Sequence, residues 1–229
     1  MTKRSIALLL LLVLLTGCGA KTEEAPWQAA YRETGKYLQE QDTLSAGSVG
    51  GEWAVIGLSR AGLLSDKAAQ SYEITAEDYV KQADSGRLDR SKSTENSRTI
   101  LGLTAAGYDA SNVAGVDLTS GLSDMNYLRI QGLNGPIWAL IALDCHSYDI
   151  PQCAEGGEQT TREGLVAEIL TSQCSDGGWT LAGDTADVDM TAMALTALAP
   201  YKDDAEVKAA VDAALTYLSD AQQADGGFM

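Results

Sequence analysis

Apolar positions along the chain gather into dense blocks separated by more polar stretches. Four blocks align without gaps and carry a leucine at one shared position, namely Leu58, Leu103, Leu143 and Leu198. The blocks read "EWAVIGLSRAG" (52–62), "SRTILGLTAAG" (97–107), "IWALIALDCHS" (137–147) and "AMALTALAPYK" (192–202). The residues one and four positions before each leucine are small. A spacing that recurs in this way indicates a repeated supersecondary unit.

The blocks are apolar nearly all round, which is typical of helices buried on both sides. Their small residues would allow neighbouring helices to approach closely. The intervening segments 161–170 and 206–220 instead carry apolar residues on one stripe, as outer helices do. A buried helix that alternates with an amphipathic one predicts stacked helical hairpins and an all-α fold.

Acidic and polar residues stand directly before the apolar blocks. Asp189 aligns with Asn134 and Thr94, and all three are residue types that commonly cap a helix N-terminus. We therefore expect Asp189 to be an N-cap whose carboxylate accepts from a backbone N–H two or three residues later. Two further roles of Asp189 stay open. It could also contact a ligand, or it could bind calcium together with Asp184 and Asp187. The spacing of these three acids is not that of an EF-hand.

The first residues of the chain predict export. A basic start, "MTKR", precedes the apolar run "SIALLLLLVLL" (5–15), which is too short to span a membrane. The following "LTGC" (15–18) resembles the bacterial lipobox, in which the cysteine becomes the lipidated first residue. We expect a signal peptide at 1–17, a lipidated Cys18 with a short linker at 18–25, and an extracytoplasmic body tethered to the outer face of the cell membrane. The alternative is an ordinary signal peptide with a coincidental cysteine.

Composition and charge limit the fold class and the kinds of partner that we expect. Alanine and leucine are abundant and Phe228 is the only phenylalanine, which favours helices. The net charge of −16 at pH 7 argues against nucleic acid as a partner, because nothing would neutralise the phosphates. The partners that we expect are the lipid bilayer, through Cys18, and an unidentified small molecule or surface protein.

Three cysteines remain after Cys18. Cys145 and Cys153 could form a disulfide across a loop, as exported proteins often do, and Cys174 would then be free. The same cysteines with His146 could form a zinc set, but none of the paired spacings of zinc modules is present. We expect no resident metal or cofactor.

The segments "LTSQCSDGGWTL" (170–181) and "LSDAQQADGGFM" (218–229) repeat at an offset of 49 residues. They are similar to the glutamine-to-tryptophan motif of the squalene cyclase and protein prenyltransferase repeat family, and the likeness covers about residues 45–229. This resemblance implies an α/α toroid of stacked hairpins. A complete toroid of that family has six hairpins, whereas about four inner helices are visible here. We therefore expect residues 26–229 to be a partial toroid, truncated at its C-terminus.

The resemblance also implies where a ligand would bind. In such a toroid the inner helices open at their N-termini onto the concave end, where ligands sit. Trp53 and Trp138 share one register there, although filling the gap between inner helices would explain them equally well. The candidate ligand contacts are Glu52, Trp53, Glu95, Asn96, Arg98, Asn134, Trp138, Asp187 and Asp189.

Two functions follow from the resemblance. The first is a cell-surface lipoprotein with a non-catalytic module for ligand binding or interaction. Its best specific ligand is a corrinoid, since the cobalamin-binding domain of intrinsic factor and transcobalamin uses a similar toroid. The alternative is an enzyme like the class II terpene cyclases, because "DVDMTAM" (187–193) resembles their DxDD motif with Asp187 first and Asp189 as proton donor. Met190 stands where the last aspartate belongs, and few aromatic residues are available to stabilise carbocations. A carbohydrate-active α/α barrel is disfavoured, because no catalytic pair of carboxylates is identifiable.

Overall fold

The computed structural model describes residues 25–40, 44–83 and 86–228, and this part of the chain is helical, with isolated β-bridges and no strand. The expected all-α class is therefore confirmed. The signal peptide and Cys18 lie outside the described residues. The α-helices are α2 (Pro26–Gln39), α3 (Val49–Arg60), α4 (Asp66–Val80), α5 (Ser93–Ala106), α6 (Met125–Leu128), α7 (Asn134–Asp144), α8 (Arg162–Thr171), α9 (Val188–Leu198) and α10 (Ala205–Ala221). Short 3-10 helices add η1 (Leu118–Leu122), η2 (Arg129–Gln131) and η3 (Ala199–Tyr201).

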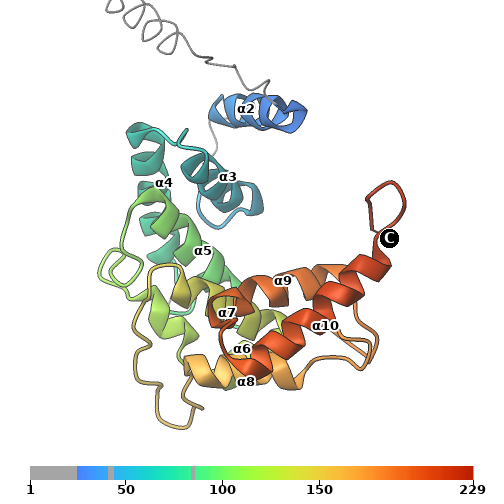
Figure 1. The fold of residues 1–229 in the computed structure, drawn as a ribbon. Helices are drawn as coiled ribbons and strands as arrows, with labels where there is room; N and C mark the ends of the chain where they lie inside the picture. The colour runs from blue at the N-terminus through green and yellow to red at the C-terminus, as the bar shows by residue number, and fades with distance from the viewer. Residues whose placement is uncertain (1–24, 41–43, 84–85, 229) are drawn as a thin grey trace, which may run out of the picture.

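The helices follow an open arc in two layers (Figure 1). The inner layer consists of α3, α5, α7 and α9, each of which packs against the next. Helix α4 packs against α3 and α5, α8 packs against α7, and α10 packs against α8 and α9. Each apolar block of the sequence thus coincides with one inner helix, and segments between the blocks supply the outer layer.

The shared leucine of the four blocks lies in the core at every repeat. Leu58, Leu103, Leu143 and Leu198 are at most 1% exposed. The small residues four positions earlier, Ala54, Thr99, Ala139 and Ala194, are also buried. The repeat alignment therefore predicts correctly which face of each inner helix enters the core.

The position directly before each buried leucine is also small, and at Gly102 the surrounding side chains require a glycine. A Cβ atom on Gly102 in α5 would overlap the hydroxyl of Tyr72 from α4 and would lie 3.2 Å from Cγ of Glu52 in α3. Tyr72 is fully buried, so its hydroxyl cannot swing out into solvent to make room. Gly57 holds the equivalent place in α3, is exposed, and would have no neighbour within 4 Å of an added Cβ. Close approach thus explains Gly102 and not Gly57.

The N-termini of the inner helices differ from the expected pattern. Asp187, not Asp189, caps α9: its Oδ1 accepts from the backbone N–H of Met190 at 2.8 Å. Asp189 lies one residue inside the helix, in its first turn. Asn134 is already the first residue of α7, after Leu133. The sequence alignment was correct in register but placed the caps too late in the chain.

Helix α5 begins with a cap from another repeat. Its N-cap residue Lys92 offers no side-chain hydrogen bond. The backbone N–H of Thr94 donates to Oε1 of Gln131 in η2 at 3.0 Å. Thr94 is therefore a capped position, not the cap that the sequence predicted.

The repeated glutamine motif forms the same loop twice. Gln173 Nε2 donates to the Gly177 carbonyl at 2.7 Å, and Gln222 Nε2 donates to the Gly226 carbonyl at 2.9 Å. Both glycines have a positive φ, of 94° and 88°. The first loop is also tied to outer helices, because Gln173 Nε2 reaches Ala210 O of α10 at 2.9 Å and the buried Trp179 donates to Ile169 O of α8 at 2.7 Å.

The contrast between the two glycines is testable. We expect Gly102→Ala to lower the free energy of unfolding by about 1–3 kcal/mol, because the added methyl group overpacks the buried Tyr72. Gly57→Ala should instead raise it by up to about 1 kcal/mol, since alanine is the better helix former and the space is open. Urea unfolding of both variants measures the difference. Equal effects of the two substitutions would contradict the packing described here.

Candidate ligand-binding groove

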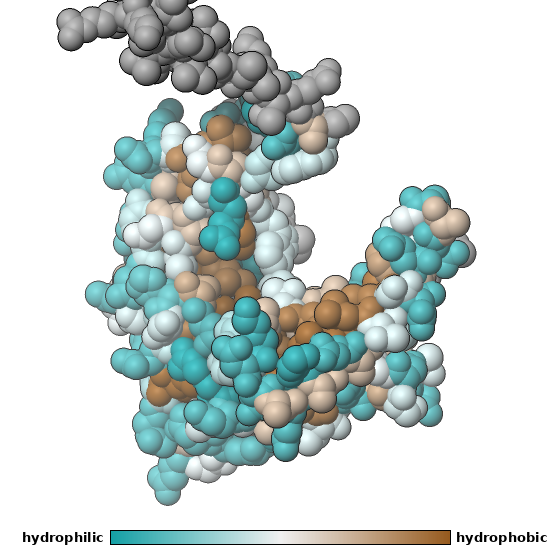
Figure 2. All heavy atoms as spheres, viewed as in Figure 1, coloured by the Kyte–Doolittle hydropathy of each residue, from teal (hydrophilic) through white to brown (hydrophobic). Residues whose placement is uncertain are grey.

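A groove of about 640 Å³ runs along the concave face of the inner helices. It is lined by Trp53, Ile56, Ser59, Arg60, Leu101, Thr104, Ala105, Trp138, Ile141, Asp144, Cys145, Thr196, Ala197 and Pro200. The lining residues up to Ala197 come from α3, α5, α7 and α9, except Cys145, which directly follows α7; Pro200 comes from η3. Figure 2 shows apolar residues along the hollow between the two arms of the arc.

The repeat itself builds the lining. Ile56, Leu101, Ile141 and Thr196 occupy one shared register, two residues before the buried leucine. Each inner helix thus turns one position toward the core and another toward the groove. This explains why the blocks read as apolar all round, although one stripe faces the concave side.

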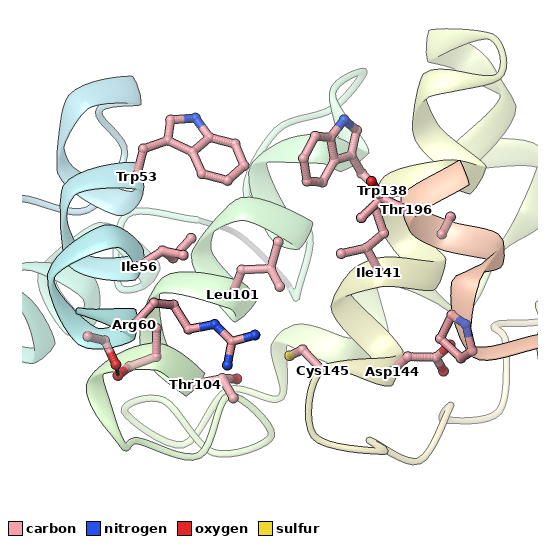
Figure 3. Close-up of a pocket in the computed structure, with 14 residues that line it drawn as sticks. Trp53, Ile56, Arg60, Leu101, Thr104, Trp138, Ile141, Asp144, Cys145 and Thr196 are labelled. Atoms are coloured by element: carbon pink, nitrogen blue, oxygen red, sulfur yellow. Dashed lines mark hydrogen bonds between the residues drawn. The ribbon is translucent and has the colours of Figure 1, made fainter. Parts of the chain in front are cut away.

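Two tryptophans stand at one end of the groove. Trp53 of α3 and Trp138 of α7 have ring centroids 5.4 Å apart and planes inclined by 58°. Figure 3 shows the rings facing each other across the groove, above Leu101 of α5. Trp53 is 41% exposed, so the pair is not sealed in the core. Because the rings touch, they partly fill the gap between inner helices, as the alternative role predicts. The contact also leaves part of the aromatic surface accessible.

The other end of the groove is more polar. Arg60, Thr104, Asp144 and Cys145 lie there (Figure 3). The Asp144 carboxylate accepts from Arg162 Nε at 2.7 Å and from the Tyr201 hydroxyl at 2.8 Å. Asp144 is therefore held in place by groups from outside the groove.

Glu52, Glu95 and Arg98 form an ionic cluster around the buried Glu52 and are not part of the groove lining. Arg98 donates to Glu95 at 2.6 Å, and its Nε lies 3.4 Å from Oε2 of Glu52. The backbone N–H of Gly47 donates to the other Glu52 oxygen at 2.6 Å. Burial raises the pKa of Glu52, because the charged form loses its hydration. The cluster joins α3 to α5 and does not line the groove.

The two asparagines among the candidates also lie outside the groove lining. Asn96 is buried; its amide nitrogen donates to the carbonyls of Gly86 and Leu118 at 2.5 and 2.9 Å, while its oxygen accepts from Leu88 N–H at 2.9 Å. It therefore holds two connecting segments against α5. Asn134 is half-buried at the start of α7. Of the nine candidates, only Trp53 and Trp138 line the groove.

The acids near α9 are not brought to the groove either. The Asp187 carboxylate is used as a cap, and Asp189 is exposed. Within residues 25–40, 44–83 and 86–228, no group of three or more His, Cys, Asp or Glu side chains is placed to hold a metal ion. Cys145, Cys153 and Cys174 are free thiols, so the bridge considered between Cys145 and Cys153 is not formed.

Sequence reasoning missed most of the groove because it assigned the apolar blocks wholly to the core. The missed lining includes Ile56, Leu101 and Ile141, and the polar residues Arg60, Thr104, Asp144 and Cys145. A signal was present in the alignment. Arg60, Ala105, Cys145 and Pro200 share one register, and a buried face would not accept an arginine there without a partner.

Comparison of the chain with protein-family models, curated proteins and solved structures gives no match. No helix in the described part of the chain is both long and apolar enough to cross a membrane. The chemistry of the groove is therefore the basis on which a function can be assigned. That chemistry combines an accessible aromatic pair, an apolar floor and a polar end.

The capping assignment separates the two acids. We expect Asp187→Ala to lower the free energy of unfolding by about 0.5–2 kcal/mol, because the N–H of Met190 loses its acceptor. Asp187→Asn should cost little, since asparagine caps equally well. Asp189→Ala should change stability by about 0.5 kcal/mol or less, because it removes only an exposed charge from the first turn. Thermal and urea unfolding give the ranking, and a larger loss at Asp189 than at Asp187 would contradict it.

Proposed function

We propose that this chain is a lipid-anchored, extracytoplasmic protein whose helical arc is part of an α/α toroid and binds a small molecule in the concave groove without transforming it. The observation that carries the proposal is the facing pair of Trp53 and Trp138 at the mouth of an apolar groove. Ligand sites are typically concave, mainly apolar, and provided with a few polar groups. The groove has each of these properties.

The exposure of Trp53 supports binding over a purely structural role. Large apolar side chains that stay accessible within a contiguous patch often mark interaction sites. Tryptophan is also enriched among residues that dominate binding energy. Covering these rings and the neighbouring Ile56, Leu101 and Ile141 would remove apolar surface from water, which is the main favourable contribution to binding.

The cyclase alternative has less support. Protonation of an alkene needs a carboxylic acid held in its neutral form beside the substrate and away from water. Asp189 is exposed and is not among the residues that line the groove, while Asp187 is engaged with the backbone of α9. A binding module requires neither acid.

The anchor is supported by the sequence of the first residues. The basic start, the apolar run and "LTGC" together favour lipidation at Cys18. A tethered binder would capture a ligand at the cell surface. A corrinoid is one candidate for that ligand.

The groove should bind a neutral apolar fluorophore. We expect N-phenyl-1-naphthylamine to gain fluorescence with the protein, and Trp53→Ala or Trp138→Ala to weaken its binding about fivefold or more, as loss of a central aromatic contact does. Trp27→Ala is the matched control, because Trp27 is exposed on α2 and does not line the groove. Equal binding by all variants would contradict the site.

The same assay separates the candidate ligands. Cyanocobalamin that displaces the fluorophore from the unchanged protein, and not from the Trp138→Ala variant, would support the corrinoid. Incubation with squalene tests the enzyme alternative. A cyclised product that disappears in Asp189→Asn would overturn the non-catalytic proposal.

The anchor has its own test. We expect metabolic labelling with a radioactive fatty acid to mark the parent protein in a bacterial host, and Cys18→Ser to abolish the label, because serine has no thiol to carry the lipid. The variant should also leave the membrane fraction. Cys153→Ser is the control and should keep its label. Unchanged labelling of the Cys18 variant would refute the lipoprotein assignment.

A further inference from the structure

The polar end of the groove carries a positive charge, that of Arg60, which no neighbour in the described part of the chain neutralises. Arg60 belongs to the last turn of α3 and is exposed. Figure 3 shows its guanidinium extending from α3 toward Thr104 and Cys145. None of the side chains that the structure describes forms an ion pair or a hydrogen bond with it.

The nearest groups at this end of the groove are already engaged. Asp144 accepts from Arg162 and from the Tyr201 hydroxyl. The Thr104 hydroxyl donates to the Ile100 carbonyl and lies 2.8 Å from the Tyr148 hydroxyl. Arg60 is therefore the group at this end with several hydrogen-bond donors still free for a ligand.

The distance between the two ends suits an elongated molecule. Trp53 and Arg60 are seven residues apart on α3, which corresponds to a rise of about 10 Å. Ile56, Leu101 and Ile141 lie between them (Figure 3). A ligand that follows the groove thus meets aromatic rings first, then aliphatic side chains, and finally a guanidinium.

We propose that the groove binds an aliphatic monocarboxylate, with its chain along the three aliphatic residues, its distal end against the tryptophans and its carboxylate on Arg60. The proposal rests on the proposed function of the same groove and names its ligand class. A guanidinium presents two parallel N–H donors that match the two oxygens of a carboxylate.

Charge favours one negative charge on the ligand over several. Arg60 supplies a single positive charge, while the Asp144 carboxylate lines the same end and the whole chain carries −16. A diphosphate would add negative charge that none of the described lining residues at this end compensates. A monocarboxylate is matched by Arg60 alone.

Displacement of N-phenyl-1-naphthylamine by three probes of equal chain length tests the proposal. Decanoate should bind at least about tenfold more tightly than decanol, because a charge-assisted hydrogen bond adds to the same apolar contact. Decyl phosphate at a pH where it is a dianion should bind no more tightly than decanoate. Arg60→Gln should reduce decanoate binding to about the level of decanol, and it should weaken decanol and the fluorophore far less than decanoate. Lys67→Gln removes the same charge from an exposed position on α4 and should have no effect.

Alkylation of thiols locates the carboxylate independently. Cys145 is exposed at the Arg60 end, whereas Cys153 and Cys174 do not line the groove. We expect saturating decanoate to slow alkylation of Cys145 by N-ethylmaleimide, measured by peptide mass spectrometry, and to leave Cys153 and Cys174 unaffected. In Arg60→Gln the protection should disappear at the same decanoate concentration.

The possible outcomes distinguish this inference from the proposed function. If the fluorophore binds in a tryptophan-dependent way but decanoate gains nothing from Arg60, the binding groove stands and the carboxylate assignment is wrong. Tighter binding of decyl phosphate than of decanoate would also overturn it. If no probe binds and light scattering shows a dimer, a second copy covers the groove, and both proposals fail.

Discussion

Each inner helix must bury one face against an outer layer while it packs beside the next inner helix. This double contact is possible because the residues at matched positions are small, as at Thr99, Ala139 and Ala194. Gly102 shows how strict the requirement becomes, because it lies against the buried Tyr72 and Glu52 with no room for a methyl group. The curvature of the arc, the concave face and the groove all follow from this packing.

The same sequence repeat supplies both the core and the lining of the groove. The register of Leu58 and its equivalents faces inward, and the register of Ile56 and its equivalents faces the concave side. Because the two registers are two residues apart, they lie on nearly opposite faces of a helix, about 160° apart around the axis. A single sequence pattern therefore provides both stability and a surface that is available to a ligand.

The sequence predicted the helical character of the chain and the four buried leucines, because both depend on local spacing that recurs. It misplaced the caps: Asp187 was available two residues before Asp189, and α5 uses Gln131 from another repeat, which no local rule reveals. The candidate site was only partly predicted. Glu52, Glu95 and Arg98 are charged and adjacent in the repeat, but whether they face a ligand or one another depends on the rotation of α3 against α5. Trp53 and Trp138 were identified because a shared register of two large aromatics stands out in any packing.

The contact between Trp53 and Trp138 joins α3 to α7, which are separated in the inner layer by α5. Stacked hairpin arrays resemble a one-dimensional chain of neighbours, in which each unit is stabilised mainly by the units beside it and the ends can open locally. A ligand that packs against both rings would strengthen this coupling between units that are not direct neighbours. Its occupancy would thus make the array unfold more cooperatively, and an empty groove would leave the hairpins around α3 freer to separate from the rest.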